Sequence, residues 1–264
     1  MITNPILLGL AVFPVLLLAL YVYRKDKFEK EPFGMLVKAF FFGCLSVIPA
    51  IILEGILSVP LELSGLDELP FFGGLYNGFV VAGFSEELCK LLLLTWAVWK
   101  SPNFNEYFDG VVYATFVSLG FACIENISYV FFQDSIYEMF GTSISRAIFA
   151  VPGHFLFGVT MGYFYSLARF QPERRRLNMA KALIFPILLH GTYDSLLMIP
   201  EGSDDLFLNG IFFLVFIGFD ICLWIWGTRR IRHMQELSST QESQGPQRPE
   251  EPHNDGFKNI DWNV

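Results

Sequence analysis

The sequence has few charged residues and lacks the common motifs of soluble enzymes. Charged residues make up 17% of the 264-residue chain, against about 25% in soluble domains. The chain has no HExxH motif, no glycine-rich phosphate-binding loop, no zinc-finger spacing and no internal repeat. These absences argue against a soluble nucleotide-binding domain and against a zinc protease with its histidines on one helix. We also expect no nucleic-acid partner.

The cysteines are few and do not form pairs by spacing. All four stand inside apolar segments, and no CxxC pair occurs among Cys44, Cys89, Cys123 and Cys222. Thiols in such surroundings behave as small buried hydrophobic groups. We therefore expect no disulfide framework.

Long apolar runs take the place of these features. The chain is 53% hydrophobic and contains 29 phenylalanines. Seven runs are each long enough to cross a hydrocarbon core at about 1.5 Å per residue. They cover approximately residues 2–23, 34–59, 75–99, 108–132, 143–168, 179–199 and 206–227. The sequence predicts an all-α, polytopic transmembrane bundle of about seven spans in the cell membrane, formed by residues 1–232.

The loops between these runs predict the topology. Lysines and arginines follow the first, third, fifth and seventh runs, whereas the alternate loops carry acids and no lysine or arginine. The positive-inside rule then predicts an outside N-terminus and a cytoplasmic C-terminus. The basic cluster follows the first run, so we expect a retained helix rather than a signal peptide. Residues 233–264 are polar and contain several prolines, and we predict a disordered cytoplasmic tail.

The third run contains charged residues where a bilayer-length helix should have none. Glu86, Glu87 and Lys90 lie in its middle. A charge near the bilayer centre costs roughly 2.5 to 17 kcal/mol, so intramembrane acids are functional candidates. Lys90 lies four residues after Glu86 and three residues after Glu87. On a helix these spacings place it on the same face as both glutamates, so it can pair with either. A purely structural ion pair is the alternative.

Three later runs carry polar residues at a similar depth. With a rise of about 1.5 Å per residue, these residues and the glutamates of the third run lie within about 10 Å of one another along the membrane normal. The fourth run contains Glu125 and Asn126, and the fifth contains His154. In the sixth, Asp194 follows His190 by four residues and can fix its tautomer. The alternatives are a hydrogen-bonded pair that joins helices for the fourth run, and core packing for the histidines.

Two further intramembrane acids are left outside the predicted site. Glu54 lies near the end of the second run and can reach the interface. Asp220 lies within the seventh run, where it either joins the cluster or pairs with Arg146.

In their order along the chain, these motifs resemble the PrsW-type intramembrane proteases. EExxK corresponds to Glu86–Lys90, FxxxEN to Phe121–Asn126 and HxxxD to His190–Asp194, with the His154 helix between the last two. That family is distantly similar to the CAAX prenyl-protease and bacteriocin-processing (CPBP) group. The resemblance covers about residues 75–199. It implies a helical membrane protease that cuts membrane-anchored proteins, with an anti-sigma factor as the substrate in bacteria.

Peptide hydrolysis needs an activated water and a group that stabilises the oxyanion. We predict Glu86 or Glu87 as the general base, and His154 and His190 as metal ligands or oxyanion donors. The supporting residues are Glu125, together with Lys90, which pairs with the spare glutamate, Asn126, which donates to the oxyanion, and Asp194, which orients His190. A divalent metal such as zinc fits two histidines and a glutamate, here His154, His190 and Glu125. A metal-free glutamate mechanism stays open.

The main alternative is an ion or proton transporter, because buried acids and histidines also build ion pathways. Such transporters commonly show two similar halves, and this chain has no such repeat. A non-catalytic scaffold would not need the buried polar set. We therefore favour the protease. The substrate, the cleavage position and the choice between Glu86 and Glu87 stay open at this point.

Overall fold

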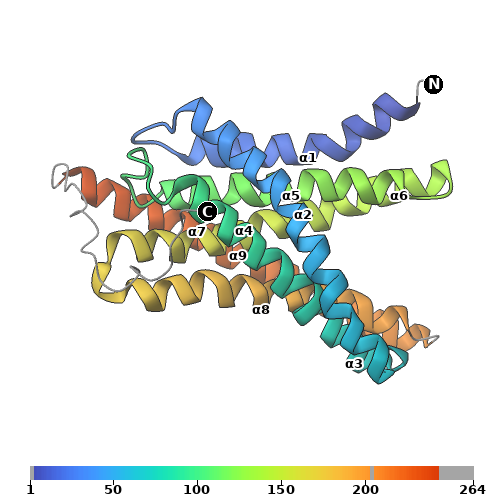
Figure 1. Ribbon diagram of the computed structural model, residues 1–264. Coiled ribbons are helices and arrows are strands. Elements are labelled where there is room, and N and C mark those ends of the chain that lie inside the picture. The colour runs from blue at the N-terminus through green and yellow to red at the C-terminus, as the bar shows by residue number, and fades with distance from the viewer. Residues whose placement is uncertain (1–2, 203–204, 244–264) are drawn as a thin grey trace.

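A computed structural model describes residues 3–202 and 205–243, and every regular element in these ranges is a helix (Figure 1). In chain order they are α1 (Thr3–Lys25), α2 (Phe33–Ser64), η1 (Leu66–Glu68), α3 (Pro70–Tyr76), η2 (Asn77–Phe84), α4 (Ser85–Val98), α5 (Asp109–Phe131), α6 (Ile136–Ser145), η3 (Arg146–Ala150), α7 (Val151–Phe170), η4 (Pro172–Arg174), α8 (Arg175–Glu201) and α9 (Leu206–Ser243).

Six helical stretches of the described chain are long and apolar enough to cross a membrane. They are Pro5–Lys25, Phe33–Ser64, Asp109–Phe131, Ile136–Phe170, Pro172–Glu201 and Leu206–Ser243. The third predicted run also forms a helical stretch, in which α3, η2 and α4 follow one another without a break over residues 70–98. Glu86, Glu87 and Lys90 stand in the middle of this stretch. The predicted all-α polytopic bundle is confirmed.

The helices run back and forth between two ends of the molecule. Figure 1 shows the turns after α1, α4 and α7 and the end of α9 together at the left end. The short helix α3 and the α5–α6 and α8–α9 connections lie at the opposite end. The basic loops therefore share one end, as the alternation of charge predicts. Which end faces the cytoplasm stays a prediction from the positive-inside rule.

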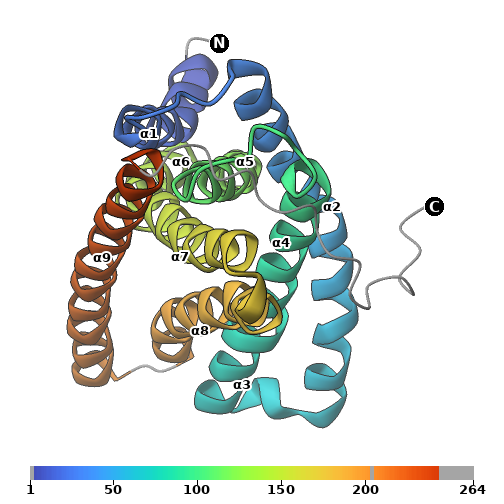
Figure 2. The ribbon, with the colours of Figure 1, turned by 90° about the vertical axis from the view of Figure 1, so that its left-hand side faces the viewer.

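Helix α7 lies in the middle of the bundle, with α1, α5, α8 and α9 around it (Figure 2). The contact between α5 and α7 is close enough to require glycine. A Cβ at Gly162 would lie 2.4 Å from the backbone oxygen of Gly110. The contact between α2 and α5 is similar, since a Cβ at Gly43 would lie 2.0 Å from the oxygen of Val117. Small residues allow such backbone contacts between membrane helices, where lipid provides no hydrophobic drive for association.

The last helix is longer than the sequence analysis predicts. α9 runs to Ser243, so the predicted start of the tail at residue 233 falls inside a helix. Ile231, Met234 and Ser238 are buried, and the Ser238 hydroxyl accepts the backbone N–H of Phe108 at 2.9 Å. These three residues recur at helical spacing, and they give the polar segment a face that packs on the bundle. The rest of the predicted tail, residues 244–264, lies outside the described residues.

Candidate active site

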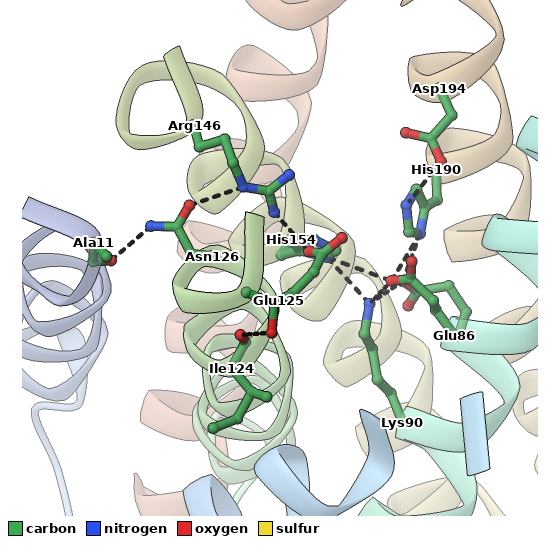
Figure 3. Close-up of polar contacts among 12 residues, drawn as sticks. Ala11, Glu86, Lys90, Ile124, Glu125, Asn126, Arg146, His154, His190 and Asp194 are labelled. Carbon is green, nitrogen blue, oxygen red and sulfur yellow. Dashed lines mark hydrogen bonds and ion pairs between the residues drawn. The ribbon is translucent and has the colours of Figure 1, made fainter. Parts of the chain in front are cut away.

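Four buried side chains from α4, α7 and α8 converge inside the bundle (Figure 3). Glu86, Glu87, His154 and His190 each offer one ligand atom, and these four atoms all lie within 4.8 Å of one another. The residues are 5%, 0%, 4% and 3% exposed, respectively. The structure thus brings together the four residues that the sequence analysis selects as catalytic.

Two helices adopt the wider π form just before they present these residues. η2 ends at Phe84, just before Glu86, and η3 ends at Ala150, one turn before His154. Short π segments inside α-helices are frequent at functional sites, where the wider turn changes the direction of the following side chains. Neither segment is predicted from the sequence.

A glycine lets α8 approach the first of these π segments. A Cβ at Gly191 would lie 2.3 Å from the ring of Phe79 in η2. The next residue toward the N-terminus is His190, so this close contact carries the imidazole to the glutamates of α4. A larger residue at position 191 would separate the two helices at the site.

Lys90 binds the glutamates from one side. Its ammonium lies 2.9 Å from Glu86 Oε2, 2.8 Å from Glu87 Oε1 and 3.1 Å from His154 Nδ1. It also lies 4.1 Å from the centre of the Phe121 ring, a favourable cation–π position. Lys90 therefore pairs with both acids rather than with one. Its ammonium contacts three of the four residues that converge, Glu86, Glu87 and His154.

His154 is fixed through both ring nitrogens. Nε2 lies 2.7 Å from Glu125 Oε2, and Nδ1 lies 4.0 Å from Glu86 Oε2 (Figure 3). Because an ammonium can only donate hydrogen bonds, the contact with Lys90 makes Nδ1 an acceptor. Nε2 then carries the proton and donates to Glu125. This network sets the tautomer of His154.

His190 has the same orientation with different partners. Its Nε2 lies 3.2 Å from Asp194 Oδ2 on the same helix, as the spacing predicts. Its Nδ1 lies 3.0 Å from Glu87 Oε1 and 3.9 Å from Glu86 Oε2. The ring also stacks on Phe157, with centroids 4.7 Å apart. Both histidines thus have Nε2 on a carboxylate and Nδ1 toward the paired glutamates.

Glu125 and Asn126 are adjacent in the sequence, but their side chains face different parts of the bundle. Glu125 reaches the site through His154, whereas Asn126 turns toward α1, where its amide N–H donates to the Ala11 oxygen at 2.6 Å. The amide oxygen of Asn126 accepts a bond from Arg146 Nε at 2.8 Å (Figure 3). The amide predicted as an oxyanion donor is therefore engaged elsewhere.

Arg146 is the site residue that the sequence analysis misses. Its Nη2 lies 2.8 Å from Glu125 Oε2, so its ion pair is with Glu125 and not with Asp220. The spacing offers a signal: Arg146 precedes His154 by eight residues, and positions i and i+8 belong to one broad face of a helix. The Oδ1 atom of Asp220 has no hydrogen-bond partner within residues 3–202 and 205–243.

The group of possible metal ligands in the structure differs from the predicted set at the glutamate. The group that converges contains Glu86 and Glu87 with the two histidines, whereas Glu125 contacts His154 at the nitrogen that faces away from the group. Glu125 and Asp194 thus have equivalent positions, each behind one histidine. In metal sites, carboxylates in this position orient the ligand histidine and fix its tautomer.

Comparison with known proteins agrees with this geometry. Residues 31–219 match the model of the PrsW family of intramembrane metalloproteases. The chain belongs to the PrsW family. Among its relatives, the protease PrsW of Clostridioides difficile (strain 630) is 38% identical over 192 residues, which cover 72% of this chain and 78% of the relative. That of Bacillus subtilis (strain 168) is 30% identical over 236 residues, 89% of this chain and 98% of the relative. No solved structure gives a significant match.

Family membership confirms the predicted activity and location. The chain is an intramembrane metalloprotease and a multi-pass integral membrane protein. Membership in the PrsW family therefore favours the protease over the transporter alternative. All eight predicted site residues and Arg146 lie inside the matched segment, whereas Ala11 of α1 lies outside it.

Proposed function

We propose that Glu86, Glu87, His154 and His190 form the catalytic centre of this protease. The observation that supports this proposal is the convergence of these four buried side chains from three helices of a membrane bundle. Such a set is costly inside a membrane. Helix packing does not require it, because close glycine contacts already join α5 to α7 and α8 to η2. A catalytic role explains why the chain keeps it.

The donor set fits a divalent metal. Three of its four atoms already hold the ammonium of Lys90, and each histidine has a carboxylate at its other nitrogen. Imidazole nitrogens and carboxylate oxygens suit zinc, which in catalytic sites takes three protein ligands and leaves one position open. We assign His154, His190 and Glu87 as ligands. When bound, zinc would polarise the scissile carbonyl and activate water.

Glu86 is the better placed general base. Its side chain is 7% exposed, whereas that of Glu87 is fully buried. Its Oε2 lies 3.9 and 4.0 Å from the two histidine nitrogens, beyond direct hydrogen bonding and suited to an intervening water. Glu86 takes a proton from this water while the oxygen of the water attacks the scissile carbonyl carbon. The same carboxyl then returns the proton to the leaving amide nitrogen as the C–N bond breaks.

The substrate follows from the position of the site. Because the four residues lie deep within membrane-spanning helices, a substrate has to present its scissile bond inside the membrane region. We propose a membrane-anchored protein substrate. The resemblance noted above makes an anti-sigma factor the first one to test.

The proposal is tested with the full-length protein in lipid vesicles that also contain a single-span substrate protein. We expect Glu86→Gln and His190→Ala to lower the cleavage rate by about 10²- to 10⁴-fold, the range for loss of a general base or its partner. Asp220→Asn is the matched control, since Asp220 is an intramembrane acid on α9, outside the site. Full cleavage by both site variants would overturn the assignment.

A further inference from the structure

The partly buried guanidinium of Arg146 lies behind His154 and is not explained by catalysis at the four central residues. Its side chain is only 14% exposed. Nη2 donates to Glu125 at 2.8 Å, Nε donates to Asn126 at 2.8 Å, and the guanidinium carbon lies 4.1 Å from the centre of the Tyr129 ring. All three partners belong to α5. One side chain that precedes α7 thus contacts α5 at three points.

The contact with Glu125 is the one that reaches the site. A single oxygen, Oε2, accepts hydrogen bonds from both Arg146 Nη2 and His154 Nε2. The second donor restrains the rotation of the carboxylate, and its charge compensates the carboxylate inside the membrane. Without Arg146, the carboxylate behind His154 would be free to turn toward other donors. The series Arg146–Glu125–His154 is therefore continuous, and it ends at Nδ1 among the glutamates (Figure 3).

A purely structural role is the simpler alternative, in which the ion pair holds α7 against α5. Two observations argue against it. The two helices are already joined by the glycine contact at Gly162 and by Gly158, where a Cβ would lie 2.8 Å from the Ser118 side chain. Buried ion pairs also contribute little net stability, because the desolvation of two charges offsets their attraction.

We propose that Arg146 is a positioning residue: it holds Glu125 so that the imidazole of His154 keeps its proton on Nε2 and presents Nδ1 to the catalytic centre. The inference rests on the proposed catalytic role of His154. The contacts of Arg146 are with Glu125, Asn126 and Tyr129 and not with the four central residues. Its effect therefore passes through Glu125 and the histidine.

The first test uses chemical rescue of the full-length enzyme in vesicles. Arg146→Ala is expected to lower kcat by about 10- to 100-fold, the usual cost of losing a partner that orients a ligand, with KM little changed. Added guanidinium ion should restore part of the activity, and urea, which has the same shape without charge, should not. Arg230→Ala is the matched control, since Arg230 contacts Tyr163 away from the site. Wild-type kcat for Arg146→Ala would overturn the proposal.

A second readout does not depend on activity. In chelator-treated, metal-free protein with ¹⁵N-labelled histidines, the His154 signal is assigned by its loss in His154→Asn. We expect one tautomer with the proton on Nε2 in the wild type and a mixture of both tautomers in Arg146→Ala. An unchanged His154 signal in that variant would contradict the proposal. Full activity of His154→Ala would instead overturn the proposed function, so the two failures are distinguishable.

Discussion

The two histidines of the site are held in the same orientation by different means. His190 takes its carboxylate, Asp194, from the next turn of its own helix, at 3.2 Å, and stacks on Phe157. His154 takes Glu125 from a neighbouring helix, at 2.7 Å, and that carboxylate is in turn held by Arg146. One histidine is thus oriented locally, and the other by the packing of α5 against α7. The second arrangement should be more sensitive to change around it.

The largest expected effect treats both histidines alike. If both serve one centre, His154→Ala and His190→Ala should each lower the cleavage rate by about 10²- to 10⁴-fold. The rate is measured with the reconstituted single-span substrate, and circular dichroism checks that both variants stay folded. A large loss for one histidine and none for the other would show that only one belongs to the centre.

The next effect separates the two carboxylates. Glu125→Gln should lower the rate by about 100-fold and Asp194→Asn by about 10-fold, within the range for groups that orient metal ligands. The reason is that His190 keeps Glu87 and Phe157 when Asp194 is lost, whereas loss of the Glu125 charge leaves the partly buried Arg146 without its counterion. Steady-state kinetics of the two variants gives the order. The reverse order would contradict the comparison.

A smaller effect measures coupling between residues. Glu125→Gln combined with Arg146→Ala should be strongly non-additive, by about 0.5 to 3 kcal/mol in the activation free energy. Asp194→Asn combined with Arg146→Ala should be additive within about 0.5 kcal/mol, because these residues share no partner. Double-mutant cycles on kcat test both statements. Equal coupling in the two cycles would remove the distinction between the histidines.

The smallest effect concerns the link to α1. Asn126→Ala removes the hydrogen bond to the Ala11 oxygen and one contact of Arg146. Hydrogen bonds between membrane helices contribute about 0.6 kcal/mol, and up to about 1.7 kcal/mol. We therefore expect a small drop in melting temperature and a loss of activity well below that of Glu125→Gln. An equal loss of activity would place Asn126 in the catalytic machinery, as the sequence analysis predicts.

The contacts within single helices, such as the one that orients His190, could be predicted from the sequence, because helical spacing alone determines them. Lys90 with Glu86 and Glu87, and Asp194 with His190, are pairs three or four residues apart on one helix. Helix lengths and depth counting also predict that four helices bring polar residues to one level. These statements need no knowledge of which helix packs on which.

The contacts between helices, such as those that orient His154, depend on tertiary packing. Whether Glu125 or Asn126 faces the site is set by the rotation of α5, since neighbouring helical residues point about 100° apart. The sequence does not contain that rotation in any local pattern, and Asn126 turns to Ala11 instead. Arg146 stands near the acidic loops and is easily assigned to the helix end. The extension of α9 depends on Ile231, Met234 and Ser238, which are too few to stand out in a polar segment.

The most direct test of the central claim is the metal content of purified, active protein, measured by mass spectrometry for the wild type and for variants of the site. We predict one zinc ion per wild-type chain, its loss in His154→Ala and His190→Ala, and its retention in Glu86→Gln, which removes the base and keeps the ligands. Full wild-type activity without bound metal, or equal metal in the histidine variants, would contradict the account.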